Sequence, residues 1–87
     1  MAQLARDFPG QPLVVEMVLK GQWRTLMGER ISGHCVPLSF QDGTLKVAAS
    51  DERWLAELSG LSEDIRKRLN RALGREIVRS VHFVSKN

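Results

Sequence analysis

The stretch VPLSFQDGTLKVAA, residues 36–49, decides the fold. At its centre Asp42-Gly43 predicts a two-residue hairpin turn, because both central positions of a type I′ turn need a positive φ and these residue types tolerate it. With this turn, three pairs of apolar residues face each other on one side of two antiparallel strands. The predicted pairs are Phe40 with Leu45, Leu38 with Val47, and Val36 with Ala49.

The other side of the predicted hairpin is mostly polar, with Ser39 opposite Lys46 and Pro37 opposite Ala48. Pro37 has no N–H group to donate to a neighbouring strand. The first strand of the hairpin is therefore expected at an edge of the sheet, or at least with the nitrogen of Pro37 turned outward.

A helical pattern precedes the hairpin. Pro12 suits the first turn of this helix, Gly21 predicts a bend or break within it, and Ser32-Gly33 ends it. The pattern starts at Leu13, and its apolar residues recur at helical spacing, namely Val15, Leu19, Trp23, Leu26 and Met27. Residues 1–12 lack such periodicity and are expected to form a flexible leader.

Two helices and a strand are expected after the hairpin. Ser50-Asp51-Glu52 provides an N-cap and two acids for a short helix that ends at Ser59-Gly60. Ser62-Glu63-Asp64 repeats this signal for a second helix that Gly74 ends. Alternation over residues 77–84 predicts the last strand. The buried stripe of the second helix would hold Ile65, Leu69, Ala72 and Leu73, and the inner face of the strand Ile77, Val81 and Phe83.

The element order α-β-β-α-α-β predicts an α+β fold, a three-stranded sheet with helices packed on one face. Residues 13–87 would form this single domain, since a chain of 87 residues is too short for two. The expected core is Leu19, Trp23, Leu26, Leu38, Phe40, Leu45, Val47, Trp54, Leu58, Ile65, Leu69, Leu73, Val81 and Phe83.

The charge is unevenly distributed along the chain. From Arg66 onward seven basic residues stand against one acid, Glu76, while residues 1–65 hold six basic and nine acidic residues. A cationic end of this kind favours a polyanion such as nucleic acid. The candidate nucleic-acid-binding residues lie on the helix face opposite the apolar stripe, on its flanks and on the hairpin: Lys67, Asn70, Arg71, Arg66, Arg68, Arg75 and Lys46.

The same sequence offers little for catalysis. Two histidines and one cysteine are too few for a structural zinc site, which needs four ligands. No Gly-rich phosphate loop is present, and the acids at the helix starts are accounted for by the helix dipole. We expect no enzyme, no cofactor, no metal and no small-molecule substrate. No apolar stretch approaches the roughly 18 residues of a membrane span, and a lone Cys35 suits a reducing cytoplasm.

Two family resemblances extend this interpretation. The element order resembles the type II KH topology, whose Gly-x-x-Gly loop here is Gly60-Leu61-Ser62-Glu63, with a glutamate at the second glycine. A closer match covers residues 15–84 and resembles the DciA family. The motifs that carry this resemblance are, in chain order, Trp23-x4-Gly28, His34 with Pro37, Asp42-Gly43-Thr44-Leu45-x-Val47, Trp54-x3-Leu58, Leu69-Asn70-x3-Gly74 and Val78-x4-Phe83.

The DciA resemblance implies a bacterial, non-catalytic protein with a KH-like domain that engages the replicative DNA helicase, helps to load it at initiation, and binds DNA itself near the nucleoid. Many DciA proteins append a flexible segment to this domain. In a chain that stops at Asn87, either the domain or the leader would contact the helicase, unless the chain is a fragment.

Two other hypotheses remain open at this stage. The chain could be a general RNA- or DNA-binding KH-like module without a helicase partner, or a scaffold that self-associates through the strand of Pro37 or through the leader.

Overall fold

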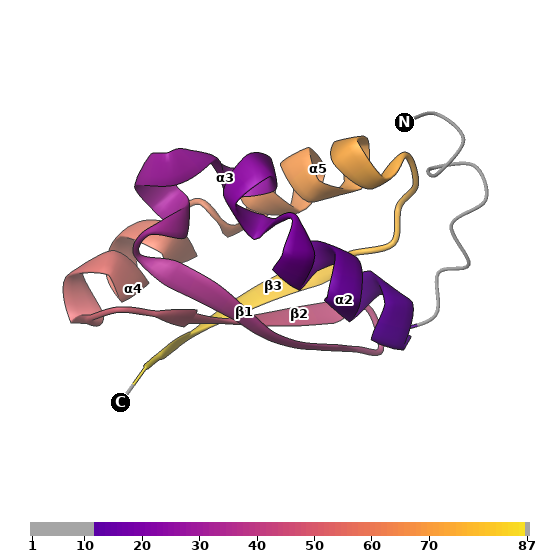
Figure 1. Cartoon of the computed structure of the whole chain (residues 1–87). Helices are drawn as coiled ribbons and strands as arrows, with labels where there is room; N and C mark the ends of the chain where they lie inside the picture. The colour runs from indigo at the N-terminus through magenta and orange to yellow at the C-terminus, as the bar shows by residue number, and fades with distance from the viewer. Residues whose placement is uncertain (1–11, 87) are drawn as a thin grey trace.

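The structure, a computed structural model, describes residues 12–86. The elements are α2 (Pro12–Gly21), α3 (Trp23–Ser32), β1 (Cys35–Gln41), β2 (Thr44–Ala49), α4 (Glu52–Ser59), α5 (Ser62–Leu73) and β3 (Ser80–Ser85). Within the described residues, the helices lie on one face of the three-stranded sheet (Figure 1). The α+β fold is confirmed. The predicted leader lies outside the described residues except for Pro12, which begins α2.

The hairpin turn forms as predicted, with φ values of 52° at Asp42 and 80° at Gly43. β1 runs antiparallel to β2, and β3 runs parallel to β2 on its other side. The turn also anchors the start of β3, because the carbonyl of Gly43 accepts hydrogen bonds from the backbone N–H groups of Arg79 and Ser80. A Cβ atom at Gly43 would lie 2.8 Å from the Arg79 side chain, so a larger residue there would have to displace Arg79 in addition to adopting a positive φ.

A bulge in β1 changes the predicted register. Phe40 pairs with Leu45 as expected, but the register shifts between Pro37 and Ser39, so that Pro37 pairs with Val47. One extra residue moves every earlier side chain to the opposite face of the sheet. Leu38 and Val36 are accordingly 41% and 42% exposed. The prediction that these two residues face the core is wrong, and Pro37 is buried instead.

The predicted break near Gly21 is confirmed, since α2 and α3 are separated at Gln22. Gly28 interrupts α3 a second time with a φ of 82°. The core lies between these helices, α4, α5 and the sheet, and contains Val15, Leu19, Trp23, Met27, Cys35, Phe40, Leu45, Val47, Ala49, Leu58, Ile65, Leu69, Leu73, Val78 and Phe83. Trp54 was expected in the core but is only partly buried. Its ring stacks on that of His34, with 4.1 Å between the ring centroids.

The ends of the later elements differ from the predicted ones by a few residues. The N-cap of α4 is Asp51 rather than Ser50, and its carboxylate accepts a hydrogen bond from the Trp54 amide at 2.9 Å. Ala72 is exposed instead of lying on the buried stripe of α5. β3 starts at Ser80 and not at residue 77. None of the described helices is long and apolar enough to cross a membrane.

Candidate nucleic-acid interface

Helix α5 carries most of the candidate site. Ile65, Leu69 and Leu73 form its buried stripe, and Gly74 ends it in the left-handed conformation with a φ of 78°, which glycine adopts without a steric penalty. The chain then turns back along the helix toward β3 (Figure 1). This return divides the rest of the helix surface into two sides. We call them the inner side, which faces residues 75–79, and the outer side.

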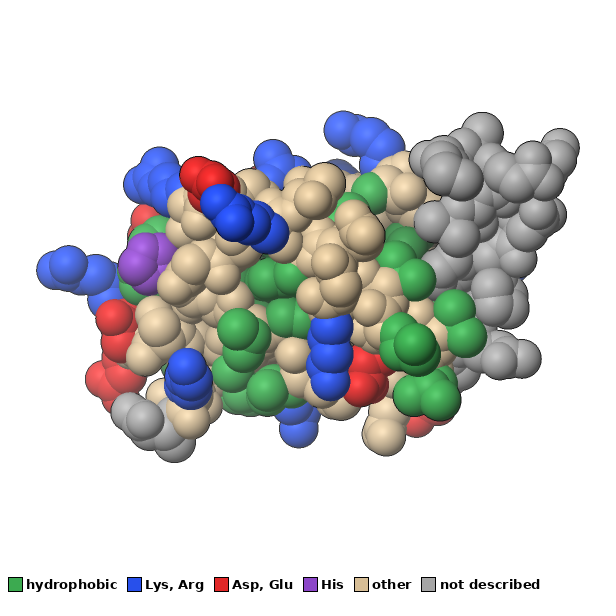
Figure 2. Space-filling view, in the orientation of Figure 1, with side chains coloured by type: hydrophobic (Ala, Val, Ile, Leu, Met, Phe, Trp, Pro, Cys, Tyr) green, Lys and Arg blue, Asp and Glu red, His purple; other side chains and the backbone are tan. Residues whose placement is uncertain are grey.

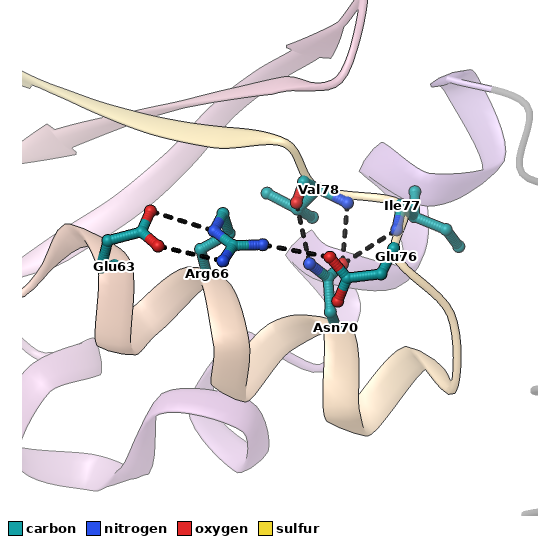
Figure 3. A network of polar contacts seen from close by, with 6 residues as sticks. All are labelled: Glu63, Arg66, Asn70, Glu76, Ile77 and Val78. Atoms are coloured by element: carbon teal, nitrogen blue, oxygen red, sulfur yellow. Dashed lines mark hydrogen bonds and ion pairs between the residues drawn. The ribbon is translucent and has the colours of Figure 1, made fainter.

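Arg66 lies on the inner side and is held by two carboxylates (Figure 3). Its guanidinium donates to Glu63 at 2.9 and 3.0 Å and to Glu76 at 3.2 Å, and its side chain is only 18% exposed. The hydrogen bonds from Arg66 hold the pKa of Glu63 below its usual value, and those carboxylates in turn raise the pKa of Arg66. Arg66 is therefore a poor phosphate ligand, because its charge is already compensated.

Asn70 lies beside Arg66 and is 4% exposed. Its amide oxygen accepts hydrogen bonds from the N–H groups of Ile77 and Val78 at 3.0 and 2.8 Å, and its amide nitrogen donates to the carbonyl of Val78 at 2.8 Å (Figure 3). The prediction that Asn70 lies on the exposed face is wrong. The segment after Gly74 covers that face and uses Asn70 in place of a neighbouring strand, which also explains the late start of β3.

The outer side carries Lys67, Arg68 and Arg71, all exposed. No carboxylate in residues 12–86 lies within ion-pair distance of these three cations. Two open hollows meet at Lys67 and Arg71, one of about 420 Å³ toward α3 and one of about 480 Å³ toward the end of α5. Their further lining residues are Ile31, Leu61, Asp64, Ile65 and Arg68 in the first and Asn70, Gly74, Arg75 and Glu76 in the second.

The last two residues predicted to bind nucleic acid, Arg75 and Lys46, lie outside helix α5. Arg75 is exposed and lines the second hollow, beyond the C-terminus of α5. Lys46 is exposed on β2 but points away from the helices, since its neighbours Leu45 and Val47 face the core. Figure 2 shows Lys and Arg side chains projecting at the edge of the molecule where α3 and α5 lie. The structure thus brings Lys67, Arg68, Arg71 and Arg75 together and leaves Lys46 apart.

Sequence reasoning missed the apolar part of the outer side. Leu61 is 39% exposed at the start of α5, and with the half-buried Ile31 of α3 it gives the first hollow an apolar wall beside Arg68. The signal for Leu61 was its position, an apolar residue between Gly60 and Ser62. Nothing in the sequence indicated that Ile31 would lie against α5.

A comparison with protein families decides the relationship. The family model described as "Dna[CI] antecedent, DciA" matches residues 4–83. The chain belongs to the DciA family. The family, as a family, is associated with bacterial DNA replication.

Individual DciA-family relatives carry the name UPF0232 protein. The one from Mycobacterium tuberculosis is 31% identical over 79 residues, which are 91% of this chain and 42% of the relative. The one from Rhodococcus jostii is 30% identical over 80 residues, 92% of this chain and 43% of the relative. The chain therefore spans less than half the length of these relatives.

Proposed function

We propose that this chain acts in bacterial DNA replication as a non-enzymatic partner of the replicative helicase. In this proposal it binds DNA through the outer side of α5 and helps to place the helicase on DNA, in the cytoplasm at the nucleoid. Family membership supports the association with replication. The DNA contact is supported by the exposure of Lys67, Arg68 and Arg71, none of which forms an ion pair within residues 12–86.

The chemistry of the outer side suits the phosphate backbone. Lysine and arginine side chains that neutralise phosphates release condensed counterions, which makes binding strong at low salt and weak at high salt. Such contacts position the nucleic acid but carry no sequence information. We therefore expect binding that depends steeply on salt and weakly on base sequence.

Within residues 12–86, the tryptophans do not offer a platform for reading bases. Trp23 is 5% exposed, and its indole N–H is bonded to the carbonyl of Cys35 at 3.0 Å. Trp54 is half-buried, and its ring is already stacked on His34. Stacking of unpaired bases needs aromatic faces that are free. This arrangement favours contacts to the phosphate backbone over recognition of bases.

The DNA contact is tested by reversing charge on the outer side. Lys67→Glu combined with Arg71→Glu should lower DNA affinity at least tenfold at about 0.1 M salt while the melting temperature stays close to that of the wild type. The matched control is Lys46→Glu combined with Arg53→Glu, which changes the net charge equally at exposed residues of β2 and α4. Equal loss of affinity in both double variants would show that only net charge matters and would contradict the proposal.

The helicase association is tested separately by co-purification. The chain, immobilised at low salt in the absence of DNA, should retain the cognate replicative helicase, and the outer-side double variant should retain it as well. A chain that binds DNA and retains no helicase would instead be a general nucleic-acid-binding module, and competition between DNA and RNA would then define its ligand.

A further inference from the structure

The two edges of the sheet differ in how their backbone groups are used. At β1, the outward carbonyl of Cys35 accepts a hydrogen bond from the Trp23 indole at 3.0 Å, and the outward N–H of Phe40 donates to the Glu16 carboxylate at 3.0 Å. Between them Pro37 has no N–H group, and the bulge follows it. Protected or irregular edges of this kind resist the addition of another strand.

The outer edge of β3 lacks these protections. Lys86 donates its N–H to the carbonyl of Ala49 across the β2 to β3 ladder, and backbone groups in a strand point alternately to either side. The N–H and C=O groups of Val81 and Phe83 therefore point away from β2. Within residues 12–86, no hydrogen bond reaches the outward groups of these two residues. β3 thus offers a short unpaired edge on the side of the sheet far from β1 (Figure 1).

The charge along this edge is positive. Arg79 and Lys86 flank β3, both exposed, and residues 79–86 contain no acid. A second copy of β3 fits poorly, because either strand direction would bring Arg79 or Lys86 of one copy close to a cation of the other, and like charges across a strand pair are unfavourable.

A nucleic acid also matches this edge less well than a peptide. A strand edge alternates donors and acceptors, and another peptide backbone satisfies both in turn, whereas phosphate oxygens only accept. The cationic ends add a preference for negative charge on the incoming segment.

From these observations we propose that the outer edge of β3 binds an extended, acidic segment of another protein by strand addition. The site is separate from the outer side of α5 and does not depend on the function proposed above. Main-chain hydrogen bonds to Val81 and Phe83 would provide the pairing, and Arg79 and Lys86 would select for carboxylates at the ends of the segment.

The test uses a display library of random ten-residue peptides selected on the whole chain, followed by amide hydrogen exchange with the best peptides. The selected peptides should carry net negative charge, slow the exchange of the Val81 and Phe83 amides at least tenfold at saturation, and leave that of Phe40 unchanged. A library that yields no binder, or binders that leave both β3 amides unprotected, would overturn the proposal.

Variants of the peptide separate strand pairing from simple charge attraction without altering the protein. Two peptides are made, one with N-methyl groups on its odd-numbered residues and one with N-methyl groups on its even-numbered residues. The peptide whose N-methyl groups replace the N–H groups that face β3 should not bind, and the other peptide should bind as before. Equal binding of the two N-methylated peptides would overturn the proposal. Two other results would also overturn it. One is slower hydrogen exchange of the Val81 and Phe83 amides when the protein concentration is raised without peptide, which would indicate self-association. The other is slower exchange of these amides when a single-stranded oligonucleotide replaces the peptide.

Discussion

Arg66 and Arg68 are two residues apart on the same helix but differ in exposure and in ion pairing. Arg66, on the inner side of α5, is held by Glu63 and Glu76 and is 18% exposed. Arg68, on the outer side, is exposed and has no carboxylate within ion-pair distance among the described residues. A count of basic residues therefore overestimates the cationic surface. What matters is which side of the helix the following chain covers.

The inner side is formed by three local features of the sequence. Gly74 lets the chain reverse at the end of α5, Glu76 then comes within reach of Arg66, and Asn70 bonds the backbone of residues 77–78. Glu63 provides the other carboxylate for Arg66. The inner side thus serves the fold, whereas the outer side keeps the exposed cations that we propose contact DNA.

The largest effect that distinguishes the two sides should come from Asn70→Ala. This change leaves the buried N–H and carbonyl of Val78 without a partner, while the Ile77 N–H still donates to the carbonyl of Arg75. Each unsatisfied group costs about 1–3 kcal/mol. We expect a loss of about 2 kcal/mol or more in the free energy of unfolding and, at about 4–8 °C per kcal/mol for a domain of this size, a fall in Tm of more than about 8 °C. Thermal unfolding of Asn70→Ala beside Arg71→Ala measures this. Similar Tm values would refute the structural role of Asn70.

A smaller effect should appear in DNA binding when the two arginines are compared. Arg68→Glu should weaken binding roughly tenfold, because a phosphate contact is replaced by repulsion, and should leave the Tm near that of the wild type. Arg66→Gln should lower the Tm and keep the DNA affinity within about twofold. Fluorescence anisotropy with a labelled oligonucleotide compares the affinities. A reversed order of the two affinities would mean that DNA contacts the inner side.

The smallest expected effect is on the stability of the protein at acidic pH. The pKa of Glu63 is lowered in the folded state below its usual 4.5 by its hydrogen bonds to Arg66. A depressed folded pKa stabilises the protein at pH values above the unfolded pKa, and this stabilisation is lost as the pH falls through the folded value. Glu63→Gln should therefore be less stable at pH 7, with the difference from the wild type shrinking below pH 4.5. Denaturant unfolding at pH 7 and pH 3 checks this, and a constant difference would contradict it.

The hairpin shows how far the sequence predicts the fold. Asp42-Gly43 predicted the turn and the pairing of Phe40 with Leu45 correctly, because turn geometry sets the register of the nearest residues. The bulge between Pro37 and Ser39 does not follow from the turn. The side chains that bond the strand on either side of it, those of Trp23 and Glu16, come from helices far away in the sequence.

The candidate site was predictable only as a set of residues. Helical spacing placed Lys67 and Arg71 away from the buried stripe, where the structure has them exposed. The same spacing placed Asn70 with them, because a helical projection treats every direction away from the core as solvent. The return of the chain after Gly74 is a tertiary feature, and neither the burial of Asn70 nor the pairing of Arg66 with Glu76 follows from periodicity.

The salt dependence of DNA binding tests the central claim most directly. The logarithm of the association constant with duplex DNA falls linearly with the logarithm of the salt concentration, with a slope of about 0.9 per neutralised phosphate. Arg68→Ala combined with Arg71→Ala should reduce the magnitude of this slope by about 1.8, and Arg66→Ala should leave it unchanged. A slope that survives the outer-side substitutions, or that falls with Arg66→Ala, would contradict a DNA contact on the outer side of α5.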